Sequence, residues 1–476
     1  MRMKMMTVIL SLVTLGAVAI GFMPYDPSEE FMEEAEKKKT EATTSEITTT
    51  TIPPTEETTA ASSEATKETS EHLYRGHVTD QNQTIVWYSF GTERLANDTY
   101  DVCLANLISD SSYIQLDKRY EKWLRSENPI FLIAENGYNK IGASVQMTID
   151  AGIQLEAYNI LEAAGIKGSI TIVDDVGRVK CAASYPSFSH NEYIKDPVLT
   201  ETERDSFNNQ AFIPATPGSI FKLLSGTVAA RYGIFSMVDK GREERYDYQN
   251  WDWNTNSAQY PCERTLQQAI MNSSNYWFGN LFYELGSDKV CSTLDEYFCF
   301  GEDIECDFGT LSQSMETDSN AALSRTGFGQ RVKVSGIYMA AVGSAVVTGE
   351  LVKPYTADKL LDTVTLQPIE VLGKKEVLST VPKEHTEALL EGMELVTADI
   401  GLSADEGYTV YSKTGTAEID ANLYTDFLYI LSTVKNEATG EVKTVVIQVQ
   451  NPEECGYVYA RDAAPVMQEV LNTMIP

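Results

Sequence analysis

The composition of residues 24–71 constrains the fold of this chain more than any other feature. This stretch is dominated by Thr, Glu, Ser, Ala and Lys, with Pro53 and Pro54 near its middle. Such a segment has too little apolar surface to offset the entropy lost on folding, so we predict a disordered stalk. Fully extended, a stalk of this length reaches ~150 Å. The 476 residues therefore divide into a short segment before the stalk and a globular part after it.

An apolar run precedes the stalk. Residues 5–23 are predominantly apolar and follow Arg2 and Lys4. A membrane-spanning helix needs about 20 such residues, and the positive-inside rule places the basic end in the cytosol. We therefore predict that residues 1–23 form a cytosolic tip and a single-pass membrane anchor. A cleaved signal peptide is the alternative, because Ala17-Val18-Ala19 has the form of a cleavage site. Both interpretations place the rest of the chain outside the cytosol.

Charge and rare residue types exclude several classes of function. The net charge of −32 argues against nucleic-acid binding, which needs a basic face. The seven cysteines and four histidines show no metal-ligand spacing, so we expect neither a metal site nor a cofactor. Because His72 and His77 lie beside the stalk, a Ser-His-Asp mechanism is disfavoured. Outside the cell, Cys291, Cys299 and Cys306 are candidates for disulfide bonds, with no pairing assigned.

The globular part predicts an α+β fold. Residues 151–165 have helical periodicity, and residues 169–184 have the pattern of two strands joined by a turn. Residues 220–347 are largely helical in pattern. Three strand-like runs then follow, "YTVYSKTGTA", "FLYILSTV" and "KTVVIQVQ", before an amphipathic helix at residues 463–474. This order predicts one antiparallel sheet assembled from both ends of the domain.

The first candidate for chemistry is the stretch "ATPGSIFKLL", which contains Ser219 and Lys222. The apolar residues around them follow helical spacing, so the first helical turn should enter an apolar interior. Residues three apart share a helix face, and a desolvated Lys222 would lose proton affinity and could act as a base for Ser219. The helix amino terminus also favours negative charge developing on the serine oxygen. The pattern alone is weak, because it recurs between Ser432 and Lys435 in a predicted strand.

Two further polar clusters follow in order along the chain. They are "NSSN", which contains Ser273 and Asn275, and "SKTGTAE", which contains Lys413, Thr414, Gly415 and Thr416. S-x-N occurs between Ser219 and Lys413 only at Ser273, and K-T-G occurs once in the chain. A helix cap or a solvated lysine explains each residue singly. The ordered set instead fits one domain that folds three elements onto one cleft.

The three clusters together resemble the motifs of penicillin-binding proteins, specifically of the transpeptidase type without a glycosyltransferase domain. Four other stretches are similar to the family: "YRGHVTDQNQTIV", "MTIDAGIQLEAYNIL", "SITIVDDVGRVKCAASYPSFSHN" and "TGFGQRVKVSGIYMAAVGSAVVTGELVKP". The resemblance covers most of residues 72–476. It implies a small amino-terminal module at residues 72–144 and a transpeptidase domain at residues 145–476. That domain would have the β-lactamase/transpeptidase-like fold, an antiparallel sheet flanked by helices with a helical subdomain.

The resemblance also implies a role for each motif residue in a serine acyl transfer. Ser219 would attack the penultimate D-Ala carbonyl of a donor stem peptide, and Lys222 would take its proton. Ser273 would relay protons towards the leaving group, and Asn275 would hold Lys222 and the substrate amide. The cleft's positive field and its carboxylate site would come from Lys413, Thr414, Gly415 and Thr416. Backbone N–H groups of Ser219 and Thr416 would form the oxyanion hole.

The partners implied are peptidoglycan stem peptides ending in D-Ala-D-Ala, β-lactams, the membrane and a separate glycan polymerase. A β-lactamase and a non-catalytic wall-binding or scaffold protein are the alternatives. A β-lactamase of class A needs a glutamate after its middle motif, and Glu263, the nearest candidate, precedes Ser273. A wall sensor is disfavoured, because few residues precede the apolar run. A scaffold would need vestigial motifs, yet no motif side chain is missing.

Overall fold

The computed structural model describes residues 74–90, 93–126, 141–197, 201–239, 262–419 and 424–475. The predicted anchor and stalk, residues 1–23 and 24–71, lie outside these ranges. So does the aromatic-rich stretch at residues 240–261. In the described ranges, no helix combines the length and apolar character needed to cross a membrane.

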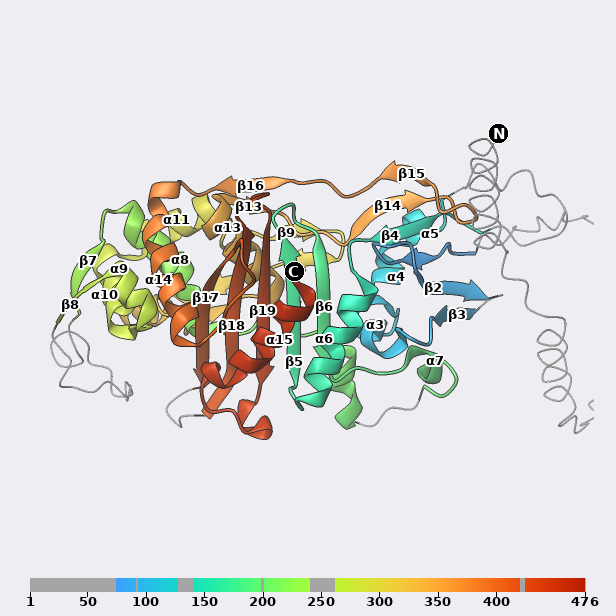
Figure 1. The fold of residues 1–476 in the computed structure, drawn as a ribbon, viewed down its shortest axis with the longest axis horizontal. Coiled ribbons are helices and arrows are strands. Elements are labelled where there is room, and N and C mark those ends of the chain that lie inside the picture. Colours follow the sequence, from blue (N-terminus) through green and yellow to red (C-terminus); the bar gives the residue numbers. More distant parts are fainter. Residues whose placement is uncertain are drawn as a thin grey trace, which may run out of the picture. The chain divides into compact units, whose positions relative to one another are not determined.

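A five-stranded antiparallel sheet forms the centre of the fold (Figure 1). Its order is β17-β18-β19-β5-β6, so strands from the carboxyl-terminal part pair with an early hairpin. The bounds are β5 Gly168–Asp174, β6 Val179–Tyr185, β17 Tyr408–Ile419, β18 Tyr424–Asn436 and β19 Val442–Gln450. The two parts join where β19 pairs with β5, with Ile447 opposite Ile170. The predicted α+β fold with a sheet built from both ends of the domain is therefore confirmed.

Helices cover both faces of this sheet. In Figure 1, α6 (Ala151–Ala163) and α15 (Ala464–Met474) lie in front of the sheet, and α13 (Gly336–Thr348) lies behind it. Asp150 caps α6 by accepting the N–H groups of Gly152 and Ile153 at 2.9 and 3.0 Å. The predicted helices at residues 151–165 and 463–474 thus agree with the structure to within two residues.

The segment predicted as largely helical forms a helical region beside β17 (Figure 1). Its helices, with α14 from later in the chain, are α8 Lys222–Arg231, α9 Leu266–Met271, α10 Asn275–Leu285, α11 Ser287–Phe298, α12 Asn320–Thr326 and α14 Glu387–Asp399. The same part of the chain also contains short strands, which are β7 Ser236–Asp239, β8 Cys262–Thr265, β9 Ile304–Cys306, β10 Gly309–Leu311, β11 Ser314–Met315 and β12 Val332–Lys333. Runs of two to four residues are too short for strand periodicity to be detected in a sequence.

A second sheet, of six strands, has the order β15-β14-β4-β1-β2-β3. Its strands are β1 Val78–Thr79, β2 Ile85–Phe90, β3 Glu93–Ala96, β4 Ser144–Met147, β14 Ala357–Leu361 and β15 Pro368–Val371. Short helices accompany it, α3 Asp101–Ile108, α4 Leu116–Arg119, α5 Glu121–Leu124 and α7 His190–Tyr193. The small pair β13 Glu350–Val352 and β16 Val377–Thr380 flanks the segment that supplies β14 and β15. The predicted module of residues 72–144 therefore shares its sheet with strands from a later segment.

All seven cysteines are free thiols. The suggestion of disulfide bonds among Cys291, Cys299 and Cys306 is therefore wrong for this structure. Cys291 lies within α11 and Cys299 directly follows that helix. Eight residues of helix separate their Cα atoms by about 12 Å, well beyond the ~7 Å that a disulfide can bridge.

We predict that Gly168→Ala destabilises the fold where the two parts of the central sheet join. A Cβ at Gly168 would lie 1.9 Å from the carbonyl oxygen of Gln448 on β19. Gly165 is the matched control, because it also has a positive φ but nothing within 4 Å of an added Cβ. In denaturant unfolding, Gly168→Ala should cost about 2 kcal/mol more than Gly165→Ala. If both variants lost the same free energy of unfolding, the positive φ would explain the loss and the close contact between β5 and β19 would not.

Candidate active site

Ser219 lies in a tight turn that packs against the edge of the central sheet. The chain forms a 3-10 helix at Gly218–Phe221, which continues directly into α8. Side chains three residues apart eclipse one another in a 3-10 helix, so this turn aligns Ser219 with Lys222. Gly218 has a φ of +55°, and a Cβ there would lie 2.3 Å from the carbonyl oxygen of Thr416. Likewise, a Cβ at Gly415 would lie 3.1 Å from the backbone nitrogen of Ile220. Glycine at both positions therefore allows the turn to approach β17.

The Lys222 amine is buried and connects the first two predicted clusters. Its Nζ lies 2.8 Å from Ser219 Oγ and 2.6 Å from Asn275 Oδ1. It also lies 2.6 Å from the carbonyl oxygen of Ser273 and 3.1 Å from Ser273 Oγ. The carbonyl and amide oxygens can only accept hydrogen bonds, so they take two N–H groups of this amine. Each hydroxyl can instead exchange a proton with the amine.

Ser273 joins this group to the third cluster. Lys413 Nζ lies 3.0 Å from Ser273 Oγ, so the hydroxyl lies between two lysine amines. The backbone of Ser273 has a φ of +51°, a conformation that non-glycine residues seldom adopt. In this conformation the carbonyl oxygen and the hydroxyl of Ser273 both face Lys222. Strain of this kind is typically maintained where function requires it.

Lys413 is fully buried in β17. Its Nζ donates a hydrogen bond to the carbonyl oxygen of Thr414 at 2.8 Å. Burial disfavours the charged form, and it lowers the pKa of Lys413 from 10.5 to about 7. Near neutral pH this amine can therefore change its charge during a reaction.

Asn275 opens α10, and its place is fixed by the residue before it. The Ser274 side chain caps the helix by accepting the N–H of Trp277 at 3.3 Å. The first residue of a capped helix has little conformational freedom. Asn275 Oδ1 is thereby held towards Lys222.

The edge strand β17 turns backbone groups towards Ser219. The carbonyl oxygen of Thr416 accepts a hydrogen bond from Gln330 Nε2 at 3.5 Å, on the side away from β18. The N–H and carbonyl of a residue in an antiparallel strand point to the same side, so the N–H of Thr416 also faces outwards. The side chains of Thr414 and Thr416 lie on one face of the strand, because they are two residues apart.

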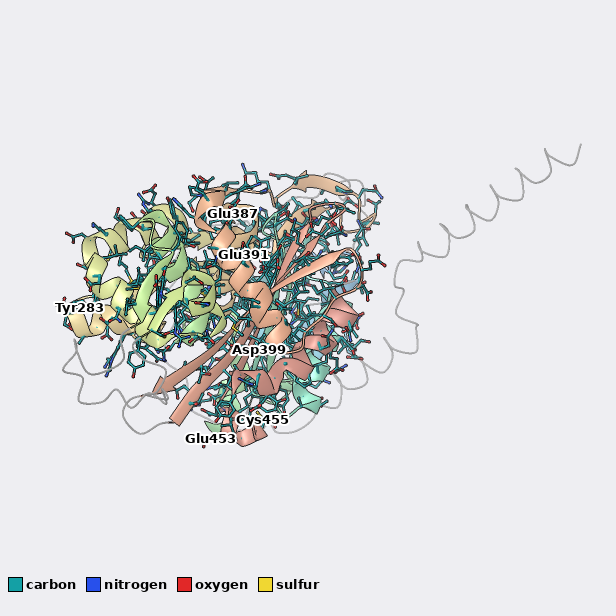
Figure 2. The ribbon with its side chains drawn as sticks, turned by 60° about the vertical axis from the view of Figure 1, so that its left-hand side comes forward. Tyr283, Glu387, Glu391, Asp399, Glu453 and Cys455 are labelled. Atoms are coloured by element: carbon teal, nitrogen blue, oxygen red, sulfur yellow. The ribbon has the colours of Figure 1, made fainter. Side chains whose placement is uncertain are left out.

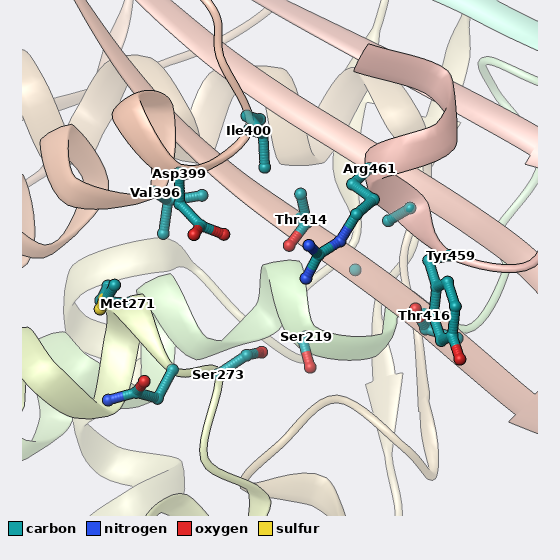
Figure 3. Close-up of a pocket in the computed structure, with 13 residues that line it drawn as sticks. Ser219, Met271, Ser273, Val396, Asp399, Ile400, Thr414, Thr416, Tyr459 and Arg461 are labelled. Atoms are coloured by element: carbon teal, nitrogen blue, oxygen red, sulfur yellow. The ribbon is translucent and has the colours of Figure 1, made fainter.

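A cavity of about 380 Å³ opens in front of these groups (Figure 3). Ser219 and Ser273 line it together with Thr414, Gly415 and Thr416. Lys222, Asn275 and Lys413 lie behind this lining and contact it through the hydrogen bonds given above. The structure therefore brings all eight predicted site residues together.

Sequence reasoning missed part of the cavity wall. Val396, Asp399 and Ile400 come from the end of α14, and Tyr459, Ala460 and Arg461 come from the segment between β19 and α15. Figure 2 shows the acidic residues Glu387, Glu391 and Asp399 following α14 to its last residue. The six lining residues from α14 and from the segment after β19 belong to no local motif, because only the tertiary fold brings them to the cavity.

The other motif matches lie elsewhere. Ser432 is buried in β18, where its Oγ lies 2.9 Å from Ser412 Oγ, and Lys435 pairs with Glu437 on the surface. Glu263 lies in β8 and accepts a hydrogen bond from Ser236 Oγ at 2.8 Å, outside the cavity lining. These contacts explain the residues structurally.

The arrangement has the parts of a nucleophilic site. A hydroxyl lies within proton-transfer distance of a buried amine, and a second hydroxyl connects that amine with another. Backbone N–H groups at a helix start and on an edge strand can stabilise an oxyanion. The geometry suits acyl transfer through a covalent serine ester.

Comparisons with known proteins agree with this geometry. A family model described as the penicillin binding protein transpeptidase domain matches residues 168–472. The chain is similar to Stage V sporulation protein D of Bacillus subtilis, with 26% identity over 365 residues. That match covers 71% of this chain and 54% of the relative, so the chain spans about half the length of that protein.

Solved structures share the fold. Penicillin-binding protein A from M. tuberculosis, in a ceftriaxone acyl-enzyme complex, gives a TM-score of 0.70 at 19% identity, covering 85% of this chain and 99% of that chain. The D,D-transpeptidase domain of a peptidoglycan glycosyltransferase from Eggerthella lenta gives a TM-score of 0.65 at 20% identity, covering 85% and 100%. At these identities the likeness establishes the fold alone.

The lowered pKa of Lys413 predicts a pH-dependent stability. Between pH 7 and 10.5 the unfolded chain binds a proton at this lysine that the folded chain does not bind. The free energy of unfolding should therefore rise with pH across this window, and the cost of burying the charge is fully present below pH 7. Relative to Lys413→Met, the wild type should gain up to about 1.4 kcal/mol per pH unit. Urea titrations at several pH values measure this difference, and parallel profiles would contradict the assignment.

Proposed function

Because this chain belongs to the penicillin-binding protein transpeptidase family, as its motifs predict, we propose that it is a peptidoglycan D,D-transpeptidase. It would cross-link stem peptides through an acyl-enzyme on Ser219 and be inhibited by β-lactams at the same residue. The observation that carries the proposal is the 2.8 Å approach of Lys222 Nζ to Ser219 Oγ. A buried amine at this distance is suited to activating the hydroxyl as a nucleophile.

In the acylation step, Ser219 Oγ attacks the penultimate D-Ala carbonyl carbon while its proton passes to Lys222 Nζ. The carbonyl oxygen becomes an oxyanion between the N–H groups of Ser219 and Thr416. One such donor typically contributes about 3 kcal/mol to transition-state stabilisation. Asn275 and the Ser273 carbonyl oxygen fix the amine during the transfer.

The leaving D-Ala needs a proton on its nitrogen when the C–N bond breaks. Ser273 Oγ lies 3.1 Å from Lys222 Nζ, so it can donate its own proton and recover one from Lys222. An acceptor amine then attacks the ester carbonyl, returns a proton along the same path and releases Ser219. The sequence of steps leaves the protein unchanged and exchanges one peptide bond for another.

Substrate recognition is assigned to the third cluster. The hydroxyls of Thr414 and Thr416 line the cavity and would bind the terminal carboxylate of the donor. Gly415 leaves room between them for the turn that carries Ser219. When protonated, Lys413 adds a positive charge behind this face of the cleft.

The cellular setting is part of the same proposal. We propose that residues 5–23 anchor the chain in the membrane and that residues 24–71 act as a stalk, with catalysis outside the cytosol. Glycan chains would then be made by a separate polymerase. A polymerase assay on this chain alone, supplied with lipid-linked precursor, tests the last point.

We predict that Ser219→Ala abolishes covalent labelling by a fluorescent penicillin. The side chain of Ser219 is only partly buried, so the free energy of unfolding should change by no more than about 1 kcal/mol. Intact-mass spectrometry and thermal melting measure the two effects. Ser432→Ala is the matched control, because it removes the serine of the second S-x-x-K pattern and should leave labelling unchanged. An adduct on Ser432 would refute the assignment.

We also predict that the penicilloyl ester on Ser219 persists for hours. Rapid hydrolysis of the ester needs a carboxylate base, and Glu263, the candidate from the sequence, lies outside the cleft. Among the described residues that line the cleft, Asp399 is the carboxylate. A rate near 10⁻⁴ per second corresponds to a barrier of about 23 kcal/mol, against about 15 for turnover near 100 per second. Following the adduct mass after drug removal tests this. Loss within seconds would establish a β-lactamase, and its suppression by Asp399→Asn would identify the base.

A further inference from the structure

The described residues that line the cavity include two charged side chains, Arg461 and Asp399. Neither belongs to a predicted motif. Both are exposed, and they approach the cavity from different elements. In Figure 3 the Arg461 side chain extends over Ser219 and beside Thr414, whereas the Asp399 carboxylate lies on the side of α14.

The backbone that carries Arg461 is held in place by local contacts. Arg461 lies in the 3-10 helix Ala460–Ala463, and the flanking alanines are buried, with 5% and 1% of their surface exposed. The Asp462 carboxylate accepts the backbone N–H groups of Val458 and Tyr459, each at 2.8 Å. Because these bonds stabilise the charged carboxylate, the pKa of Asp462 is lowered. Arg461 therefore projects from a fixed turn.

The guanidinium of Arg461 takes no part in these local hydrogen bonds. Within the described part of the chain, no hydrogen bond or ion pair joins its guanidinium to another side chain, although its charge acts on the adjacent Asp462 carboxylate. By contrast, Arg94 is held by Asp117, and Arg178 by Asp174. An arginine needed only for the turn would be expected to bond to it. This guanidinium instead keeps its donors available at the cavity.

We propose that Arg461 is a specificity-determining residue that binds the substrate carboxylate next to the bond attacked by Ser219. This inference rests on the proposed function and adds to it a residue outside the three motifs. The planar fork of a guanidinium binds a carboxylate through two parallel hydrogen bonds that carry a positive charge, and this charge would add to the neutral hydroxyls of Thr414 and Thr416.

The charge state of Lys413, the other basic residue discussed at the cavity, supports this assignment. Lys413 has a pKa of about 7, so its positive charge is only partial under neutral conditions. Arginine remains charged at every working pH. Arg461 thus supplies the lasting positive charge in the lining, and Asp399 opposes it. The binding of a ligand with a free carboxylate should be favoured by Arg461 and disfavoured by Asp399.

The experiment compares benzylpenicillin with its methyl ester, which lacks the negative charge. Second-order rate constants for acylation of the full chain are measured by intact mass for the wild type and variants. Arg461→Gln should slow acylation by benzylpenicillin about 10- to 100-fold, the usual loss for a hydrogen bond to a charged group, and change the ester rate less than about twofold. Arg461→Lys should recover part of the rate, since it keeps the charge but not the fork.

Two controls complete the design. Lys435→Gln removes one positive charge outside the cavity and should leave both rates unchanged. Asp399→Asn should raise the rate for benzylpenicillin and leave that for the ester. Equal loss of both rates in Arg461→Gln, or no loss in either, overturns the inference while the acyl-enzyme stands. If neither compound acylates Ser219 in the wild type, the proposed function itself fails.

Discussion

The arrangement of the site depends on one buried nitrogen, Lys222 Nζ. A buried amine is costly unless its hydrogen bonds are satisfied, so the fold must supply partners from several elements. Asn275 and the backbone of Ser273 provide acceptors, and Ser219 Oγ completes the set. The unusual backbone of Ser273 follows from this requirement, because one residue delivers both its carbonyl oxygen and its hydroxyl to the same amine. The first two motifs, which are far apart in the sequence, thus meet because each supplies a hydrogen-bond partner to Lys222 Nζ.

The second constraint is the close approach of a helix start to the edge of a sheet. An edge strand such as β17 exposes backbone groups that could pair with another chain. Here the turn at Gly218–Phe221 covers that edge, and the missing side chains of Gly218 and Gly415 set the distance. The carbonyl oxygen of Thr416 accepts a hydrogen bond from Gln330, and in the proposed mechanism the N–H of Thr416 would bind the oxyanion. The contact between the turn at Gly218–Phe221 and β17 therefore both covers the edge strand and places Ser219 beside it.

The sequence predicts the parts of this site that are local. Ser219 and Lys222 share a face within one turn, and the hairpin at residues 169–184 shows its own periodicity. The left-handed backbone of Ser273 and the outward N–H of Thr416 depend on tertiary contacts and strand register, which leave no local pattern. Arg461 reaches the cleft only because the chain crosses back after β19. The strands β14 and β15 are likewise missed as partners of the amino-terminal sheet, since their pairing is set over long sequence separations.

The charge of the whole chain opposes the charge of the cleft. A net charge of −32 repels an anionic substrate at long range, but ionic screening limits this to ~8 Å at physiological salt. Within that distance Lys413, Arg461 and the opposing Asp399 contribute to the potential that the substrate meets. Burial of the amine lowers the pKa of Lys413 to about 7. With its pKa near neutral pH, a small change in the surroundings of this amine, such as the arrival of a carboxylate, can decide its charge.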